Sequence, residues 1–236
     1  MLGPVTQDPA YHHFADAHVR LGIPNGADTL SNVAFLLVGV AGLLFLWRRR
    51  FEELRAYQVL FGAVTATAFG SAYYHLAPDD ARLVWDRLPM AVGFMALVAA
   101  VTGERISSAL GRRLLLPLIA AGLASVVYWA SVGDLRPYLL TQYGSIAFVL
   151  ALAACCRSRY TQGWVIVLAV GIYVLAKLCE AYDRQIYALT AEAVSGHTLK
   201  HLLAAAALYA ILRSLARRSL RPLVDHPLRL ADRALH

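Results

Sequence analysis

The feature that most constrains this chain is a series of long apolar runs separated by short, arginine-bearing loops. Seven such runs occur, at approximately residues 30–47, 57–75, 85–102, 114–132, 137–156, 163–181 and 198–215. An α-helix rises about 1.5 Å per residue, so about 20 residues are needed to cross the ~30 Å hydrocarbon core of a bilayer. The pattern therefore predicts an all-α fold, an integral membrane bundle of seven transmembrane helices.

Composition excludes the main alternatives to a membrane bundle. Hydrophobic residues make up 59% of the chain and charged residues only 16%, whereas soluble domains average roughly 45–50% and 25%. A soluble globular enzyme and a disordered chain are therefore excluded. The three cysteines include no Cys-x-x-Cys pair, so we expect free thiols rather than a disulfide framework.

The loops between the runs are too short to hold a second domain, which predicts three parts. These are an extramembrane N-terminal arm over residues 1–29, the seven-helix transmembrane domain over 30–215 and a basic cytoplasmic tail over 216–236. The arm lacks a basic segment followed by an apolar core, so it does not have the pattern of a cleaved signal peptide. We expect the first apolar run to serve as the membrane signal.

The distribution of arginine predicts the orientation of the bundle. The net charge is +7, and the cations are 20 arginines and two lysines. Most arginines lie in the tail and in the loops after the first, third and fifth runs, whereas the intervening loops carry acids that include Asp79, Asp80, Asp134 and Asp183. Because cytoplasmic loops are enriched in Lys and Arg, we expect an outer N-terminus and a cytoplasmic C-terminus. The basic excess indicates contact with anionic lipid headgroups and no nucleic-acid partner.

Histidine placement is the most informative feature for function. Of the eight histidines, His75 closes the second predicted helix, and His197 and His201 open the seventh, on the same outer side of the membrane. Their spacing of four puts His197 and His201 on one helix face, where they can bind one ion, although such a pair can also hydrogen-bond neighbouring helices. A third histidine at the same depth completes a three-histidine site with an open fourth position, as in catalytic zinc sites.

Two further residues are placed to act beside this metal site. Ser71 lies four residues before His75, on the same helix face, and Asp86 lies at the outer start of the third helix. A serine hydroxyl can donate to a developing oxyanion, and a carboxylate can accept the proton of the attacking water. Alternatively, Ser71 is a small residue that permits close helix packing, and Asp86 is an N-cap. Convergence at one depth favours the site, because ionisable residues within membrane helices are costly.

Acidic residues near the end of the sixth helix are expected to support the site. Lys177, Glu180 and Asp183 recur at a spacing of three, which favours a structural ion pair between helices or a supporting role next to the metal ligands. Asp183 is the better candidate and Glu180 the second, because a metal-bound histidine usually donates its other N–H to a carboxylate.

Several segments of the sequence resemble a known family. They are DTLSNVAFLLVG (28–39), SAYYHLAPDDARLVWDRLPM (71–90), YDR (182–184) and HTLKHLLAA (197–205). These segments are similar to those of the alkaline ceramidases. That family lies within the seven-helix hydrolase superfamily, which also includes the progestin and adiponectin-Q receptors. The resemblance implies a zinc-dependent amidase that acts on ceramide-like lipids. It places zinc on the three histidines and makes Asp86 the base and Ser71 the oxyanion donor.

The N-terminal arm departs from the pattern of animal and yeast members, which hold a regulatory calcium there. Only Asp16, Asn25 and Asp28 offer oxygen ligands in this arm, whereas Ca²⁺ takes six or more. We therefore do not expect calcium regulation. The arm is instead similar to that of bacterial members, which implies a bacterial inner-membrane location.

Two other functions fit parts of the sequence. The first is a receptor or haemolysin-like member of the same superfamily, which would keep the metal as a structural ion without amidase activity. A hydrolase releases fatty acid from the lipid, whereas such a receptor binds the lipid without releasing it. A haem-b carrier or a transporter is disfavoured, because the His-x-x-x-His pair crowds a porphyrin and no broken helices or paired midplane charges are evident.

Overall fold

The computed structural model describes residues 3–222, and within that range the chain is built of helices with no strand. The elements are η1 (Pro9–His12), α1 (Gly26–Ser31), α2 (Val33–Leu46), α3 (Leu54–Leu76), α4 (Asp80–Arg105), α5 (Ser108–Val132), α6 (Arg136–Leu139), η2 (Leu140–Gly144), α7 (Ser145–Cys155), α8 (Val165–Ala181), α9 (Asp183–Leu189) and α10 (Gly196–Arg217). Residues 223–236 of the predicted basic tail lie outside the described residues.

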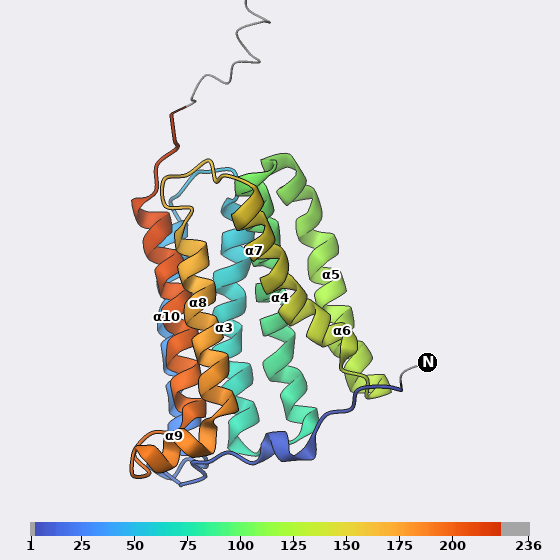
Figure 1. Cartoon of the computed structure of the whole chain (residues 1–236), viewed down its shortest axis with the longest axis vertical. Helices are drawn as coiled ribbons and strands as arrows, with labels where there is room; N and C mark the ends of the chain where they lie inside the picture. Colours follow the sequence, from blue (N-terminus) through green and yellow to red (C-terminus); the bar gives the residue numbers. More distant parts are fainter. Residues whose placement is uncertain (1–2, 223–236) are drawn as a thin grey trace, which may run out of the picture.

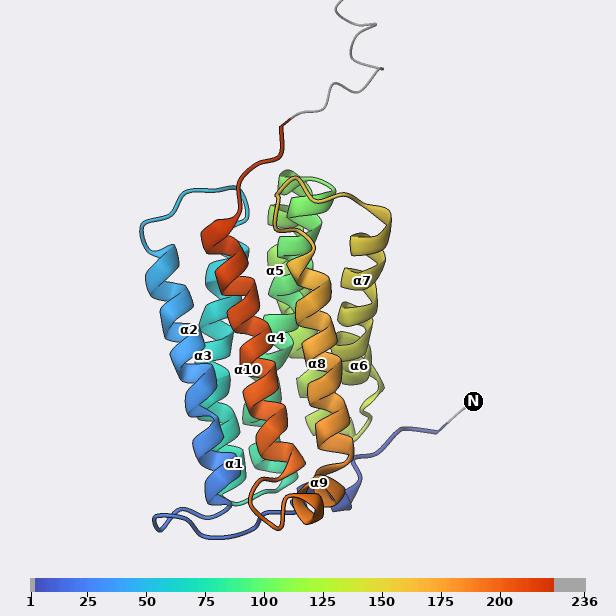
Figure 2. The ribbon, with the colours of Figure 1, turned by 60° about the vertical axis from the view of Figure 1, so that its left-hand side comes forward.

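The long helices stand side by side in one bundle, and the N-terminal arm crosses one end of it (Figures 1 and 2). Every predicted apolar run falls on helical residues. The first run is formed by α1 and α2 together, and the fifth by α6, α7 and η2, a π-helical turn between them. The predicted all-α fold is therefore confirmed.

Membrane crossing is supported for most of these helices. Among the described residues, five helical stretches are long and apolar enough to span a bilayer, and a sixth is added if α8 and α9 count as one span bent by 81°. Helix α3 is also 23 residues long, but Gln58, Thr65, Thr67 and Ser71 make it more polar. The bundle is thus that of an integral membrane protein, while the number of seven spans stays a prediction.

The outer surface of the bundle is apolar, as contact with lipid requires. Leu37 is 65% exposed, Leu44 71% and Leu116 74%, all on helix faces that point away from the bundle. The three cysteines are free, as expected.

Helix α4 begins earlier than the sequence pattern predicts. Asp79 is its N-cap, and the Asp79 carboxylate accepts a hydrogen bond of 2.7 Å from the amide of Arg82. Asp86 therefore lies in the second turn of the helix. The alternative interpretation of Asp86 as an N-cap is wrong, since Asp79 and the following turn already satisfy the free amides of the helix start.

Close packing of α3 on α4 depends on a glycine. A Cβ atom added to Gly70 would lie 2.1 Å from the carbonyl oxygen of Trp85, so no larger residue fits. Ser71 follows Gly70 on α3, and Asp86 follows Trp85 on α4. The close approach of Gly70 to Trp85 therefore also brings Ser71 near Asp86.

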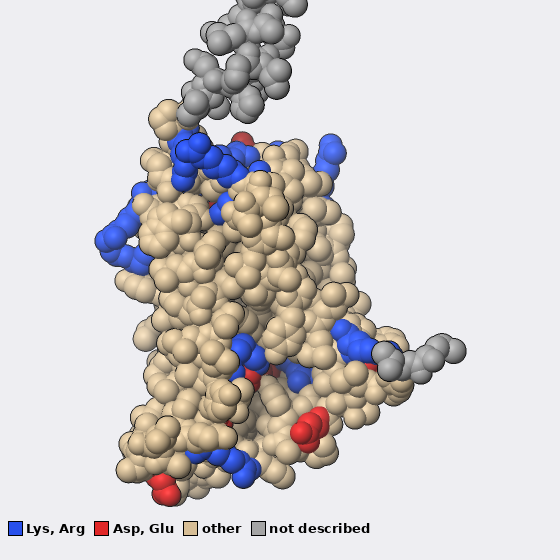
Figure 3. All heavy atoms as spheres, viewed as in Figure 1, with Lys and Arg blue, Asp and Glu red and all other residues tan. Residues whose placement is uncertain are grey.

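Arginine gathers at the end of the bundle from which the C-terminal segment leaves, as Figure 3 shows. One of these arginines has a different role from the predicted contact with lipid headgroups. The Arg218 side chain is only 7% exposed and forms an ion pair with Glu104, while Tyr57 donates a hydrogen bond of 2.7 Å to the same carboxylate. Arg218 therefore fastens the end of α10 to α3 and α4.

Candidate metal centre

Three buried imidazoles meet at the opposite end of the bundle, under the N-terminal arm. His75, His197 and His201 are 1–3% exposed, and one ring nitrogen from each lies within 4.8 Å of the others. The ring centroids are 4.8 to 5.0 Å apart, and the Nε2 atoms of His75 and His197 are separated by 3.3 Å. The structure thus brings together the three histidines that the sequence analysis selected.

The positions of these histidines follow from two helix ends. His75 lies in the last turn of α3, where the Asn25 side chain donates a hydrogen bond of 2.7 Å to its carbonyl oxygen. Helix α10 is capped by Ser195, whose hydroxyl accepts from the amide of Thr198, so His197 and His201 fall in its first two turns. Gly196 lets this end approach α8, because a Cβ there would lie 2.1 Å from the carbonyl oxygen of Cys179.

The histidine cluster fits a transition metal. Zn–N bonds of about 2.0–2.1 Å in a tetrahedral site place two ligand nitrogens about 3.3–3.4 Å apart, which agrees with the spacing between His75 and His197. Without an ion, the facing Nε2 atoms of His75 and His197 can share only one proton between them. An ion at the centre gives the three lone pairs a common partner, so the cluster can hold a metal ion.

Ser31 orients the third ligand. Its hydroxyl donates to the carbonyl oxygen of Asp28 at 2.7 Å and lies 2.7 Å from Nδ1 of His201. Since the only hydroxyl proton goes to Asp28, Ser31 accepts from the Nδ1–H group, which leaves the lone pair of Nε2 for an ion. Ser31 was not selected from the sequence, although it lies in the family-like stretch DTLSN.

The arm and α2 cover the histidine cluster with aromatic rings. The Phe14 ring centroid lies 4.7 Å from that of His75 and 4.5 Å from that of His197, and the Phe35 centroid lies 5.8 Å from that of His201. These rings limit the access of water from the end of the bundle that the arm crosses.

Asp183 contacts the site in a different way from the one expected. Its carboxylate accepts a hydrogen bond of 2.8 Å from the backbone amide of His197 and another of 2.8 Å from the amide of Ala15. Both of these bonds come from main-chain amides and not from an imidazole N–H. Asp183 thus fixes the start of α10 and one end of the arm.

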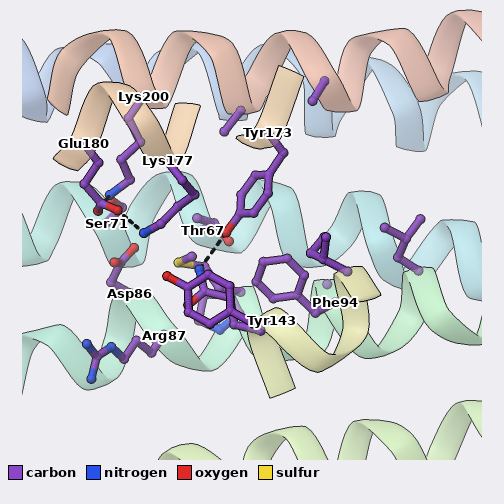
Figure 4. A pocket seen from close by; sticks show the side chains of 18 of the residues that line it. Thr67, Ser71, Asp86, Arg87, Phe94, Tyr143, Tyr173, Lys177, Glu180 and Lys200 are labelled. Atoms are coloured by element: carbon purple, nitrogen blue, oxygen red, sulfur yellow. Dashed lines mark hydrogen bonds and ion pairs between the residues drawn. The ribbon is translucent and has the colours of Figure 1, made fainter. Parts of the chain in front are cut away.

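Ser71 and Asp86 lie together beside the cluster. Both are buried, and the Ser71 hydroxyl is within hydrogen-bonding reach of the Asp86 carboxylate across the α3–α4 interface (Figure 4). The sequence analysis selected both residues, and the structure brings them to the same cavity as His201.

Glu180 forms the expected ion pair between helices, with a partner that the sequence analysis missed. Its carboxylate pairs with Lys177 on its own helix and, at 2.8 Å, with Lys200 on α10. The Lys200 ammonium also lies 3.3 Å from Nε2 of His197. Lys200 stands between the two ligand histidines in HTLKH, and a charge at such a place in an apolar helix was the signal that could have revealed it.

These side chains line the polar end of a cavity of about 350 Å³. Its inner part is apolar and is lined by residues such as Leu60, Val64, Leu97, Val170 and Ile211. In Figure 4 the charged groups lie at one end and Phe94 lies towards the other. Figure 3 shows a hollow in which atoms of basic and acidic side chains are visible, and the same view in Figure 1 has α8 on one side of this place and α6 on the other. This end of the bundle is therefore open sideways.

The N-terminal arm closes the end of this cavity at which the charged side chains lie. It is fastened at one side by the amide of Val5, which donates to Asp134 at 3.2 Å, and hydrogen bonds from Arg136 lower the pKa of that carboxyl to about 2. Over the cavity, the Tyr11 hydroxyl donates to Glu180 at 3.2 Å. Burial raises the pKa of Tyr11 to about 12, which keeps it a donor at neutral pH.

The candidate calcium ligands of the arm have other partners. Asp16 binds His18 and, at 2.8 Å, Arg20; Asn25 donates to the backbone at His75; and Asp28 accepts from Ser195 and Thr198. These three residues therefore belong to separate hydrogen-bonding arrangements.

The structure is thus an apolar helix bundle of the integral membrane class, in which a buried three-histidine cluster next to an internal cavity can hold a metal ion. A family model for the ceramidases matches residues 23–220, and the chain belongs to the ceramidase family. A comparison with curated proteins finds no match. Family membership implies a hydrolase that acts on the amide bond of a lipid.

Proposed function

We propose that this protein is a zinc-dependent intramembrane hydrolase that cleaves the amide bond of ceramide-like N-acyl lipids into a free fatty acid and a sphingoid-type amine. The observation that carries the proposal is the meeting of the His75, His197 and His201 cluster with Ser71 and Asp86 at the polar end of a mainly apolar cavity. An acyl chain fits the apolar part and places its amide group beside the polar residues.

The polar side chains have distinct roles in this proposal. Zinc, when bound to the three histidines, polarises the amide carbonyl and lowers the pKa of a bound water towards ~7. Asp86 accepts a proton from the attacking water and delivers it to the leaving amine. The Ser71 hydroxyl donates a hydrogen bond to the carbonyl oxygen as negative charge develops there.

The topology completes the proposal. We infer seven spans, with α3 and α8 among them, an outer arm over residues 1–29 and a cytoplasmic tail over 216–236. The arginine-rich end in Figure 3 then faces the cytoplasm, as the enrichment of cations in cytoplasmic loops requires. The metal centre faces the other side, and a bacterial inner membrane is the expected location.

Metal analysis combined with fatty-acid release tests this function. The purified wild type is expected to bind about one zinc and to release fatty acid from N-acyl sphingosines. Replacing any of the three histidines by alanine should remove most of the zinc. Asp86→Asn should lower the turnover rate about 10²–10⁴-fold and Ser71→Ala about 10²–10³-fold, both with zinc retained.

Several results would contradict these roles. Loss of zinc in Asp86→Asn would make this carboxylate a metal ligand, and full activity in both variants would remove Asp86 and Ser71 from catalysis. Lipid binding without release of fatty acid would favour the receptor-like alternative with a structural metal.

A further inference from the structure

Arg87 is a buried cation that the proposed reaction does not use. It is only 6% exposed, and its guanidinium lies over the rings of Trp129 and Tyr138, at 4.1 and 4.7 Å from their centroids. Its Nη2 atom donates a hydrogen bond of 2.6 Å to the side-chain oxygen of Gln7. Among the described residues, no carboxylate forms an ion pair with Arg87, and its Nη1 atom is buried without a hydrogen-bond partner.

This arrangement leaves a buried arginine without a direct ion pair, although the Asp86 carboxylate is close enough to interact with its charge electrostatically. Arginine stays protonated in proteins, and a buried charge is costly unless a counter-charge and hydrogen bonds satisfy it. The aromatic faces and the Gln7 amide supply part of this stabilisation, but neither carries a negative charge. The free Nη1 edge therefore suits an anion, because guanidinium donors match the planar geometry of a carboxylate or phosphate.

The position of Arg87 indicates which part of a ligand it meets. Arg87 lines the same cavity as Asp86 and Ser71. In Figure 4, Phe94 lies towards one end of the cavity, Asp86 lies further along α4, and the Arg87 guanidinium lies beyond it. An acyl chain beside Phe94 with its amide group at Asp86 therefore directs the remaining part of the lipid towards Arg87.

The other cations at this end of the cavity agree with an anionic ligand. Lys177 and Lys200, the two lysines of the chain, share the single carboxylate of Glu180. With Arg87, three cations face the two carboxylates of Asp86 and Glu180 at this end of the cavity, so positive charge is in excess there.

We propose that Arg87 binds an anionic group, a carboxylate or a phosphate, at the polar end of the N-acyl lipid substrate. That the bound lipid is a substrate rests on the proposed function, whereas binding of an anion by Arg87 does not depend on turnover. Arg87 then contributes to headgroup specificity, because it lowers KM for an N-acyl lipid with an anionic headgroup and has no effect on that for neutral ceramide.

Binding of single-chain amphiphiles tests the anion site without any reaction. The purified protein in neutral detergent is titrated with hexadecyl phosphate, palmitate and hexadecanol. The wild type should bind one or both anions about 10- to 100-fold more tightly than the alcohol, as expected for a charge-assisted hydrogen bond. Comparison of the phosphate with the palmitate shows which anion the site prefers.

Two variants and one control assign this preference to Arg87. Arg87→Gln removes the charge, and Gln7→Glu places a carboxylate against it, so both should reduce the preference for anions at least tenfold. Arg82→Gln is the control, because Arg82 lies on the same helix and interacts with Asp79 and Tyr73. An anion preference that is absent in the wild type, or unchanged in both test variants, overturns the proposal.

Turnover separates the anion site from the proposed function. Ceramide, ceramide 1-phosphate and N-palmitoylglycine are compared as substrates, and Arg87→Gln should raise KM for the anionic lipids while leaving that for ceramide unchanged. Equal loss of activity on all three substrates would make Arg87 merely structural and overturn the inference. If no lipid is hydrolysed but the binding preference holds, the proposed function fails and the anion site stands.

Discussion

The contact between Gly70 and Trp85 offers a test of the site that leaves its chemical groups unchanged. A Cβ atom at residue 70 would lie 2.1 Å from the Trp85 carbonyl oxygen, and real Cβ contacts essentially never fall below 3.0 Å. In Gly70→Ala, α3 and α4 must therefore separate by at least 0.9 Å, the difference between these distances. Such overpacking typically costs about 1–3 kcal/mol of stability.

The separation should affect catalysis much more than metal binding. Ser71 belongs to α3 and Asp86 to α4, whereas the three histidines belong to α3 and α10. A misplacement of about 1 Å can lower a rate about 10²-fold. We therefore expect Gly70→Ala to keep about one zinc per chain and to lose about 99% of its fatty-acid release.

The same helix supplies the matched control. A Cβ atom at Gly62, also on α3, meets nothing within 4 Å. Gly62→Ala should therefore keep full activity and gain up to about 1 kcal/mol of stability, because alanine favours the helix. Zinc content, fatty-acid release and thermal unfolding in detergent are measured for both variants. Wild-type activity in Gly70→Ala, or loss of its zinc, would refute the reasoning.

Three further predictions concern the ligands, the topology and the arm. Ser31→Ala removes the partner of His201 Nδ1 and should weaken zinc affinity about 10–100-fold in a chelator competition, while Ser31→Thr keeps it; equal affinities would contradict this orienting role. Reporter proteins inserted in the α2–α3 and α4–α5 loops should report the cytoplasm and one in the α3–α4 loop the outer side; the reverse pattern would invert the bundle. Calcium chelation should leave activity unchanged, since Asp16 is already paired with Arg20 and His18; stimulation by added calcium would contradict this.

The helices and the metal ligands could be predicted from the sequence because each leaves a strong local signal. A stretch of about 20 apolar residues has few alternatives to a membrane helix. Likewise, the His-x-x-x-His spacing places His197 and His201 on one helix face. His75 could be added to this pair because the predicted topology puts it at the same depth in the membrane. Hydrophobicity does not mark where a helix starts, so α4 was predicted to begin at residue 85 although Asp79 caps it.

The residues that were missed act across helices that are distant in the sequence. Ser31 reaches His201 across 170 positions, and Tyr11 reaches Glu180 across 169. Neither pairing has a spacing rule, because the first depends on how α1 packs on α10 and the second on how η1 packs on α8. Arg87 was passed over for the same reason, since only the structure shows that it lines the cavity without a direct ion pair among the described residues.

The sideways hollow between α8 and α6, together with the arm that covers the outer end, has a kinetic consequence. A lipid that reaches the cavity through this hollow comes from the surrounding leaflet and never passes through water, and its products return the same way. The relevant substrate concentration is then the mole fraction in the membrane. Adding inert lipid at a constant amount of substrate should slow the enzyme by surface dilution, whereas diluting the whole suspension with buffer should leave the rate per enzyme unchanged.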